Sequence, residues 1–123
     1  MNIVIWVLQV LLAAAFAAAG LMKLTQPRTK LTQNMGWVED FSDSGVKGIG
    51  GVELLAAIGL ILPAATKILP VLTPLAATGL VLLMIGAIVT HVRRNENQMI
   101  APAAVLLILA AVVTWARFGP YSL

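Results

Sequence analysis

The sequence predicts an all-α protein, a four-helix transmembrane bundle with a short interfacial helix between its first two spans. Three observations support this fold. Hydrophobic residues make up 60% of the 123 residues and charged residues only 11%, whereas soluble domains are about half apolar and about a quarter charged. Four apolar stretches are long enough to cross a bilayer as helices. Proline, glycine and charged residues separate them, and a chain of this length forms one domain, residues 1–123.

The composition also excludes several kinds of chemistry. The chain has no cysteine, which rules out disulfides, thiolate nucleophiles, cysteine-ligated zinc and iron-sulfur clusters. It has one histidine, His91, so two histidines of one chain cannot hold a haem, and no metal site is predicted. The net charge is +3, but the basic residues stand in short loops beside apolar spans. They indicate headgroup contacts and topology, and no nucleic-acid partner is expected.

The first predicted helix covers about residues 3–24. Its apolar run, Ile3 to Met22, is interrupted only by Gln9 as a strongly polar residue, and twenty residues span a bilayer. Gln9, Phe16 and Lys23 recur at seven-residue spacing and therefore share a face, which we expect to point into the bundle. A signal peptide is the alternative, because the small residues from Ala13 to Gly20 offer a place where a peptidase could cut, but no lysine or arginine precedes the run.

A polar connection follows, with a weaker helical pattern inside it. Leu31, Met35 and Val38 fall at i, i+4 and i+7, which indicates an amphipathic helix. We expect a short helix over residues 29–41 that lies at the membrane interface, with Trp37 at headgroup depth. An ordered loop with scattered apolar residues is the alternative.

The second predicted span covers about residues 46–62 and contains a carboxylic acid, Glu53. Pro63 is expected to end it, because proline lacks the N–H group that a helix interior needs. On the helix wheel Glu53 shares a face with Gly50, Ala57 and Leu60. An ionisable group in hydrocarbon is costly, so this face should point to protein.

The third and fourth spans are predicted over about residues 74–92 and 101–118. Thr73 and Pro74 resemble an N-cap and a first helical residue. Arg93 and Arg94 follow His91 at the end of the third span, where cations suit the helix dipole and an interfacial position. Pro102 suits the first turn of the fourth span.

Three ionisable side chains are expected to meet at one end of the bundle. Lys23 ends the first span, Glu53 lies near the start of the second, and His91 ends the third. With Gln9 they form the predicted polar core. The pattern alone leaves three roles open: a buried pair that only fixes packing and register, a site for a polar headgroup or quinone ring with Glu53 as acceptor or proton donor, or a protein contact.

The distribution of positive charge predicts the orientation. Four spans place both termini on one side. The connections after the first and third spans carry six of the lysines and arginines near the helix ends, namely Lys23, Arg28, Lys30, Lys47, Arg93 and Arg94, whereas Lys67 and Arg117 lie on the other side. The positive-inside rule then places both termini outside the cytoplasm. We expect a multi-pass protein of a bacterial cell membrane.

Several segments together resemble the DoxX-like membrane proteins across nearly the whole chain. They are AAGLMKL at the end of the first span, VKGIGGVELLAAIGLILP, LLMIGAIVTHVRR and a closing ARF. The resemblance implies a four-helix transmembrane bundle in which Lys23, Glu53 and His91 match the polar positions of the pattern. It also implies a spread of roles, because the family takes its name from a membrane subunit linked to thiosulfate oxidation with quinone as acceptor, and relatives include membrane-protein assembly factors.

Two functions of different classes follow. The first is an accessory or binding protein that holds an apolar ligand or a membrane partner around Glu53, or that forms a homo-oligomer through small residues such as Gly79 and Gly86. The second is the membrane subunit of a quinone-linked oxidoreductase, with quinone as cofactor and the electron donor on a separate chain. A transporter is a third, and it would need at least a dimer to form a path.

Overall fold

The computed structural model describes residues 2–26 and 43–122, and within these residues the chain forms four α-helices. They are α1 (Asn2–Thr25), α3 (Asp43–Thr66), α4 (Leu72–Arg93) and α5 (Asn97–Phe118). Each is long and apolar enough to cross a membrane. The predicted all-α fold with four apolar helices is therefore confirmed. The interfacial helix predicted over residues 29–41, with Trp37, lies outside the described residues.

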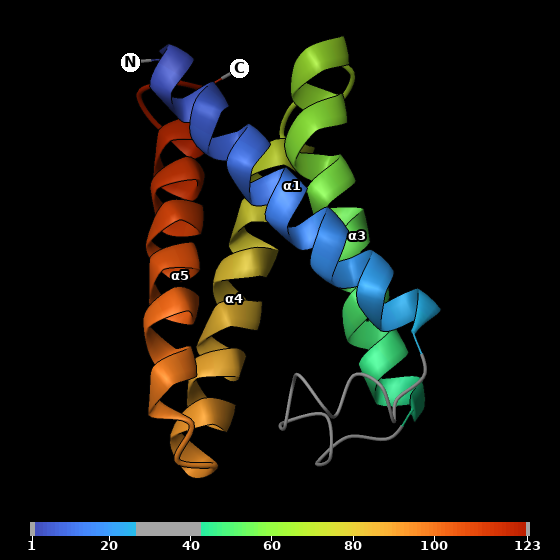
Figure 1. Ribbon diagram of the computed structural model, residues 1–123. Coiled ribbons are helices and arrows are strands. Elements are labelled where there is room, and N and C mark those ends of the chain that lie inside the picture. Colours follow the sequence, from blue (N-terminus) through green and yellow to red (C-terminus); the bar gives the residue numbers. More distant parts are fainter. Residues whose placement is uncertain (1, 27–42, 123) are drawn as a thin grey trace.

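The helices form two pairs that share one core. α1 packs mainly against α3, and α4 packs mainly against α5. In Figure 1, α1 runs obliquely from the C-terminal end of α5 to the N-terminal end of α3. The shared core lies midway along the helices and includes Leu12 and Phe16 of α1, Leu60 of α3, Leu80 of α4 and Val113 of α5.

The two pairs are joined near the end that carries both termini. There the side chain of Arg117 in α5 donates to Asn2 of α1, and Thr73 of α4 donates to the Gly59 carbonyl of α3. Toward the opposite end, the α1 and α3 pair moves away from the α4 and α5 pair (Figure 1). The bundle is therefore closed at the terminal end and wider where α1 and α4 finish.

Two glycines allow α1 and α3 to touch where they cross. A Cβ atom built on Gly20 would lie 2.6 Å from the Gly50 carbonyl oxygen. A Cβ atom on Gly50 would lie 2.7 Å from the Cβ of Lys23 and 2.9 Å from the Gly20 oxygen. Small residues let membrane helices approach in this way, so this crossing fixes the distance between Lys23 and α3.

Replacing Gly50 with alanine should therefore weaken the α1–α3 contact. We expect Gly50→Ala to lower the free energy of unfolding in bicelles by about 1–3 kcal/mol, the usual cost of overpacking. Gly51→Ala is the matched control, because a Cβ there meets nothing within 4 Å. Equal effects of the two substitutions would contradict the assigned crossing.

The prediction that Pro63 ends the second span is wrong, because α3 continues through Pro63 to Thr66. Proline cannot bond the carbonyl four residues earlier, here Gly59, and its ring disturbs the preceding turn. Side chains of other helices compensate. The Thr73 hydroxyl donates to the Gly59 oxygen at 3.1 Å, and the Gln9 amide Nε2 donates to the Leu60 oxygen at 2.6 Å. Neighbouring helices often make proline tolerable inside membrane helices by this means.

The starts of α4 and α5 also differ from the sequence prediction. α4 begins at Leu72, and its N-cap is Val71, whose side chain has no hydrogen-bond acceptor. The hydroxyl of Thr73, the predicted N-cap, donates to the Gly59 carbonyl instead. α5 begins at Asn97, five residues before Pro102. Pro102 leaves the Gln98 carbonyl without its helical donor, and Gln98 is exposed in the first turn, where solvent or headgroups can bond it.

Candidate functional site

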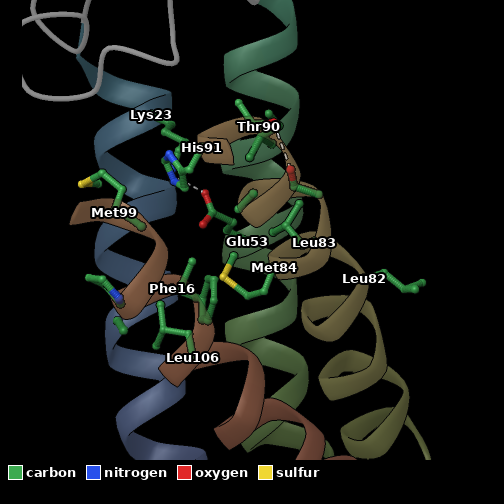
Figure 2. Close-up of a pocket in the computed structure, with 17 residues that line it drawn as sticks. Phe16, Lys23, Glu53, Leu82, Leu83, Met84, Thr90, His91, Met99 and Leu106 are labelled. Atoms are coloured by element: carbon green, nitrogen blue, oxygen red, sulfur yellow. Dashed lines mark hydrogen bonds and ion pairs between the residues drawn. The ribbon is translucent and has the colours of Figure 1, made fainter. Parts of the chain in front are cut away.

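A cavity of about 450 Å³ lies between the two helix pairs, and all four helices line it. Its lining is mainly apolar, with ionisable groups at the end where α1 and α4 finish. In Figure 2, Lys23, His91 and Glu53 lie toward that end, and Phe16, Met84 and Leu106 lie farther along the helices. Cavities of this size hold small molecules in many proteins.

The first polar group of the cavity is an ion pair between α1 and α3. Lys23 Nζ lies 2.6 Å from Glu53 Oε1 (Figure 2), and the two residues are only 5% and 4% exposed. The contact is short, but it lacks the direction of a good hydrogen bond. Glu53 lies ten residues after the first residue of α3, about 15 Å along the axis. Lys23 lies two residues before the end of α1, so its stem reaches inward from the rim.

The second polar group is an imidazole held by the turn between α4 and α5. α4 ends at Arg93, and Asn95 in the following turn lies in the left-handed region, at φ 57°. The backbone N–H groups of Asn95 and Glu96 donate to the carbonyls of Val92 and His91, which is a Schellman C-cap. This turn places Glu96 Oε1 3.0 Å from His91 Nδ1, and Arg94 Nε lies 3.5 Å from Glu96 Oε2.

This pairing fixes how His91 meets the cavity. The residue is 6% exposed and lines the cavity. A carboxylate beside Nδ1 favours the proton on that nitrogen, so a neutral ring would present Nε2 as a hydrogen-bond acceptor. Sequence reasoning missed Glu96. The available signal was an asparagine able to adopt a positive φ directly after the helix, followed by an acid.

The structure brings Lys23, Glu53 and His91 to one cavity and places Gln9 elsewhere. Gln9 lies fourteen residues before Lys23, about 21 Å along α1. Its Oε1 accepts from Arg117 Nε at 2.6 Å, while its Nε2 donates to the Leu60 carbonyl. Gln9 therefore belongs to a second polar cluster at the terminal end of the bundle.

Arg117 is the centre of this second cluster. It is 3% exposed, and its Nη1 donates to Asn2 Oδ1 at 2.7 Å and to the Tyr121 carbonyl at 2.8 Å. The guanidinium carbon also lies 5.7 Å from the centre of the Trp6 ring, within cation–π range. No acidic partner of Arg117 is found within residues 2–26 and 43–122. Sequence reasoning treated this residue only as a topology signal.

The remaining predicted residues occupy the rim. Arg93 is exposed at the end of α4, and Arg94 is half-buried beside Glu96. Both positions suit contact with headgroups. Trp37 lies outside the described residues. Among the residues that the structure describes, no group of three or more histidine, cysteine, aspartate and glutamate side chains could hold a metal ion.

One comparison with known proteins finds a relationship. The sequence profile described as the DoxX-like family matches residues 7–113 of the chain. This range includes Lys23, Glu53, His91 and Glu96 of the cavity, but of the side chains of the second cluster it includes only Gln9. Searches of curated proteins and of solved structures find no significant match.

Proposed function

This chain belongs to the DoxX-like family and is an integral multi-pass membrane protein, and from this premise we propose that it binds a small amphipathic molecule in the cavity around Glu53. Binding of this kind is an accessory role without chemistry of its own. The lipid bilayer is its environment and the source of the ligand.

One observation carries the proposal: the cavity is apolar along its length and ends in three buried ionisable side chains, Lys23, Glu53 and His91. A residue pair that served only packing and register would need no space beside it. Apolar pockets with a few convergent polar groups are the usual form of small-molecule sites, and ionisable residues inside a membrane protein usually mark function.

A quinone is the second candidate ligand. The supporting observation is that a carboxyl group and an imidazole line the same cavity, since both can exchange protons with a ring carbonyl. The electrons would come from a separate protein, because this chain has no cysteine for a thiol or cluster centre. A reconstituted protein that binds no ubiquinone analogue in the cavity would exclude this candidate.

A membrane-protein partner is the third form of the accessory role. The exposed faces of α4 include Gly79 and Gly86, where an added Cβ meets nothing within 4 Å. Such small residues suit helix association with a partner or a second copy. Crosslinking in native membranes that recovers no consistent product would count against it.

Filling the cavity tests the proposed binding. Gly86 lines the cavity, and a Cβ there meets nothing within 4 Å, so Gly86→Phe should fold and occupy ligand space. We expect it to weaken binding of a hydrophobic fluorescent probe by about tenfold or more, about 1.4 kcal/mol. Gly79→Phe is the matched control, because Gly79 is equally open but does not line the cavity. Equal probe binding by both variants would contradict the proposal.

We also propose that the rim with Lys23 and His91 faces the cytoplasm. The support is the excess of lysine and arginine in the first and third connections. Both termini would then lie on the non-cytoplasmic side. A reporter fused to the C-terminus and active only in the cytoplasm should be silent, and an active reporter would reverse the orientation.

A further inference from the structure

We propose that the ligand of this cavity is an uncharged lipid alcohol, a molecule with one hydroxyl head and a single apolar chain or ring system. The inference rests on the proposed binding function and adds the chemistry of the ligand. Charge balance, hydrogen-bonding capacity and the direction of the cavity each support it.

The charges around the cavity are already matched by the protein. Lys23 and Glu53 are paired at 2.6 Å, and the Glu96 carboxylate lies 3.5 Å from the Arg94 guanidinium. Among residues 2–26 and 43–122, no charged side chain other than these groups lines the cavity, so a charged head would enter a weakly polar space and would also disturb a buried pair. Burying a charge without a partner costs several kcal/mol, so the site should reject anionic and cationic heads.

A hydroxyl matches the hydrogen-bonding groups that remain. Lys23 engages Oε1 of Glu53, and a carboxylate can accept further bonds on its second oxygen. His91 uses Nδ1 with Glu96, which leaves Nε2 as an acceptor in the neutral ring. Apart from the Lys23 ammonium group, which is paired with Glu53, these groups at the polar end of the cavity accept hydrogen bonds. A hydroxyl can donate to one of them, whereas a ketone oxygen can only accept.

The polar and apolar ends of the cavity are also arranged like those of a lipid in a bilayer. The polar end lies at the rim, where α1 and α4 finish, and the lining then passes from Lys23 to Ala15 along α1, about 12 Å toward the bilayer centre. A head at the rim and a chain toward the centre is the orientation that a lipid has in the membrane.

The ligand can enter from the side. Leu82 and Gly86 of α4 and Pro102 of α5 line the cavity and are also exposed, and Leu82 points away from the other labelled side chains (Figure 2). In a bilayer these positions face acyl chains. A lipid-soluble molecule can therefore reach the cavity without crossing water.

Methionine methyl groups provide the measurement. Met84 and Met99 line the cavity, and Met22 of α1 does not. In protein labelled with ¹³C-methyl methionine in zwitterionic bicelles, dodecanol should shift the Met84 and Met99 signals saturably and leave Met22 unchanged. Dodecanoate, dodecyltrimethylammonium and the ketone 2-dodecanone should each bind about tenfold more weakly at equal content in the bicelle.

Removing the negative charge of Glu53 should alter the preference for dodecanol over dodecanoate. Glu53→Gln leaves Lys23 without its carboxylate, so dodecanoate should now bind more tightly than dodecanol. The double variant Lys23→Met with Glu53→Gln removes both charges and should restore the preference for an uncharged head over dodecanoate. If either variant fails to fold, the comparison of the four probes on the wild-type protein still tests the proposal.

The outcomes separate the two proposals. If no probe shifts Met84 or Met99, the binding function itself fails. If the wild-type protein binds dodecanoate or dodecyltrimethylammonium as tightly as dodecanol, the cavity binds amphiphiles but the inferred uncharged head is wrong. If 2-dodecanone binds as tightly as dodecanol, the inferred hydroxyl donor is wrong.

Discussion

Lys23→Met is expected to lower the free energy of unfolding by about 3 kcal/mol, because it leaves Glu53 buried without its partner. Glu53 is 4% exposed and lies ten residues inside α3. Its short side chain cannot reach the rim from there. The measurement is reversible unfolding in bicelles, with ligand-free protein so that binding does not contribute.

Glu53→Leu should cost clearly less than Lys23→Met. Lys23 lies two residues before the end of α1, and its long stem can turn the ammonium group to the interface once the carboxylate is gone. The double variant Lys23→Met with Glu53→Leu should regain most of the stability that Lys23→Met loses. An apolar pair of similar volume often replaces a buried ion pair at little cost. Additive effects of the two substitutions would show that the pair does not interact.

Arg117→Met is expected to destabilise the terminal end of the bundle by about 3 kcal/mol. The guanidinium donates to Gln9, Asn2 and the Tyr121 carbonyl. Its removal leaves the buried Gln9 Oε1 without a donor, and an unsatisfied buried polar atom costs about 1–3 kcal/mol. The lost charge-assisted bonds add to this cost.

The matched control for this variant is Arg93→Met, which removes the same charge from an exposed position at the end of α4. It should change stability by less than about 0.5 kcal/mol. Because Arg117 lies away from the cavity, Arg117→Met should leave the Met84 and Met99 shifts with dodecanol intact. Loss of those shifts in a variant that remains folded would contradict the separation of the two clusters.

The sequence predicted what depends on periodicity within one helix. Glu53 shares its face with Gly50 and Ala57, and all three are buried. Gln9 and Lys23 share the buried face of α1 for the same reason. Residues on one face of a helix can still lie at different depths in the membrane, however. The seven-residue pattern therefore could not show that Gln9 lies far along α1 from Lys23 and the rim.

The features that the sequence did not predict depend on contacts between helices. α3 passes Pro63 because Thr73 and Gln9, distant in the chain, bond the carbonyls of Gly59 and Leu60. The role of Arg117 likewise arises from Gln9 and Asn2, which only the folded bundle brings near. Glu96 is the exception, because it reaches His91 through the local turn after α4. Local proline rules describe an isolated helix, and a bundle can satisfy the same groups from outside it.

The most direct test of a polar cavity among four membrane helices is an experimental density map of the protein extracted in its native lipids. We expect Glu53 to be paired with Lys23 inside the bundle, and elongated density to begin beside Glu53 and His91 and continue past Phe16. A map in which the Glu53 carboxylate points to acyl chains, or in which packed side chains fill the space beside it, would contradict the account.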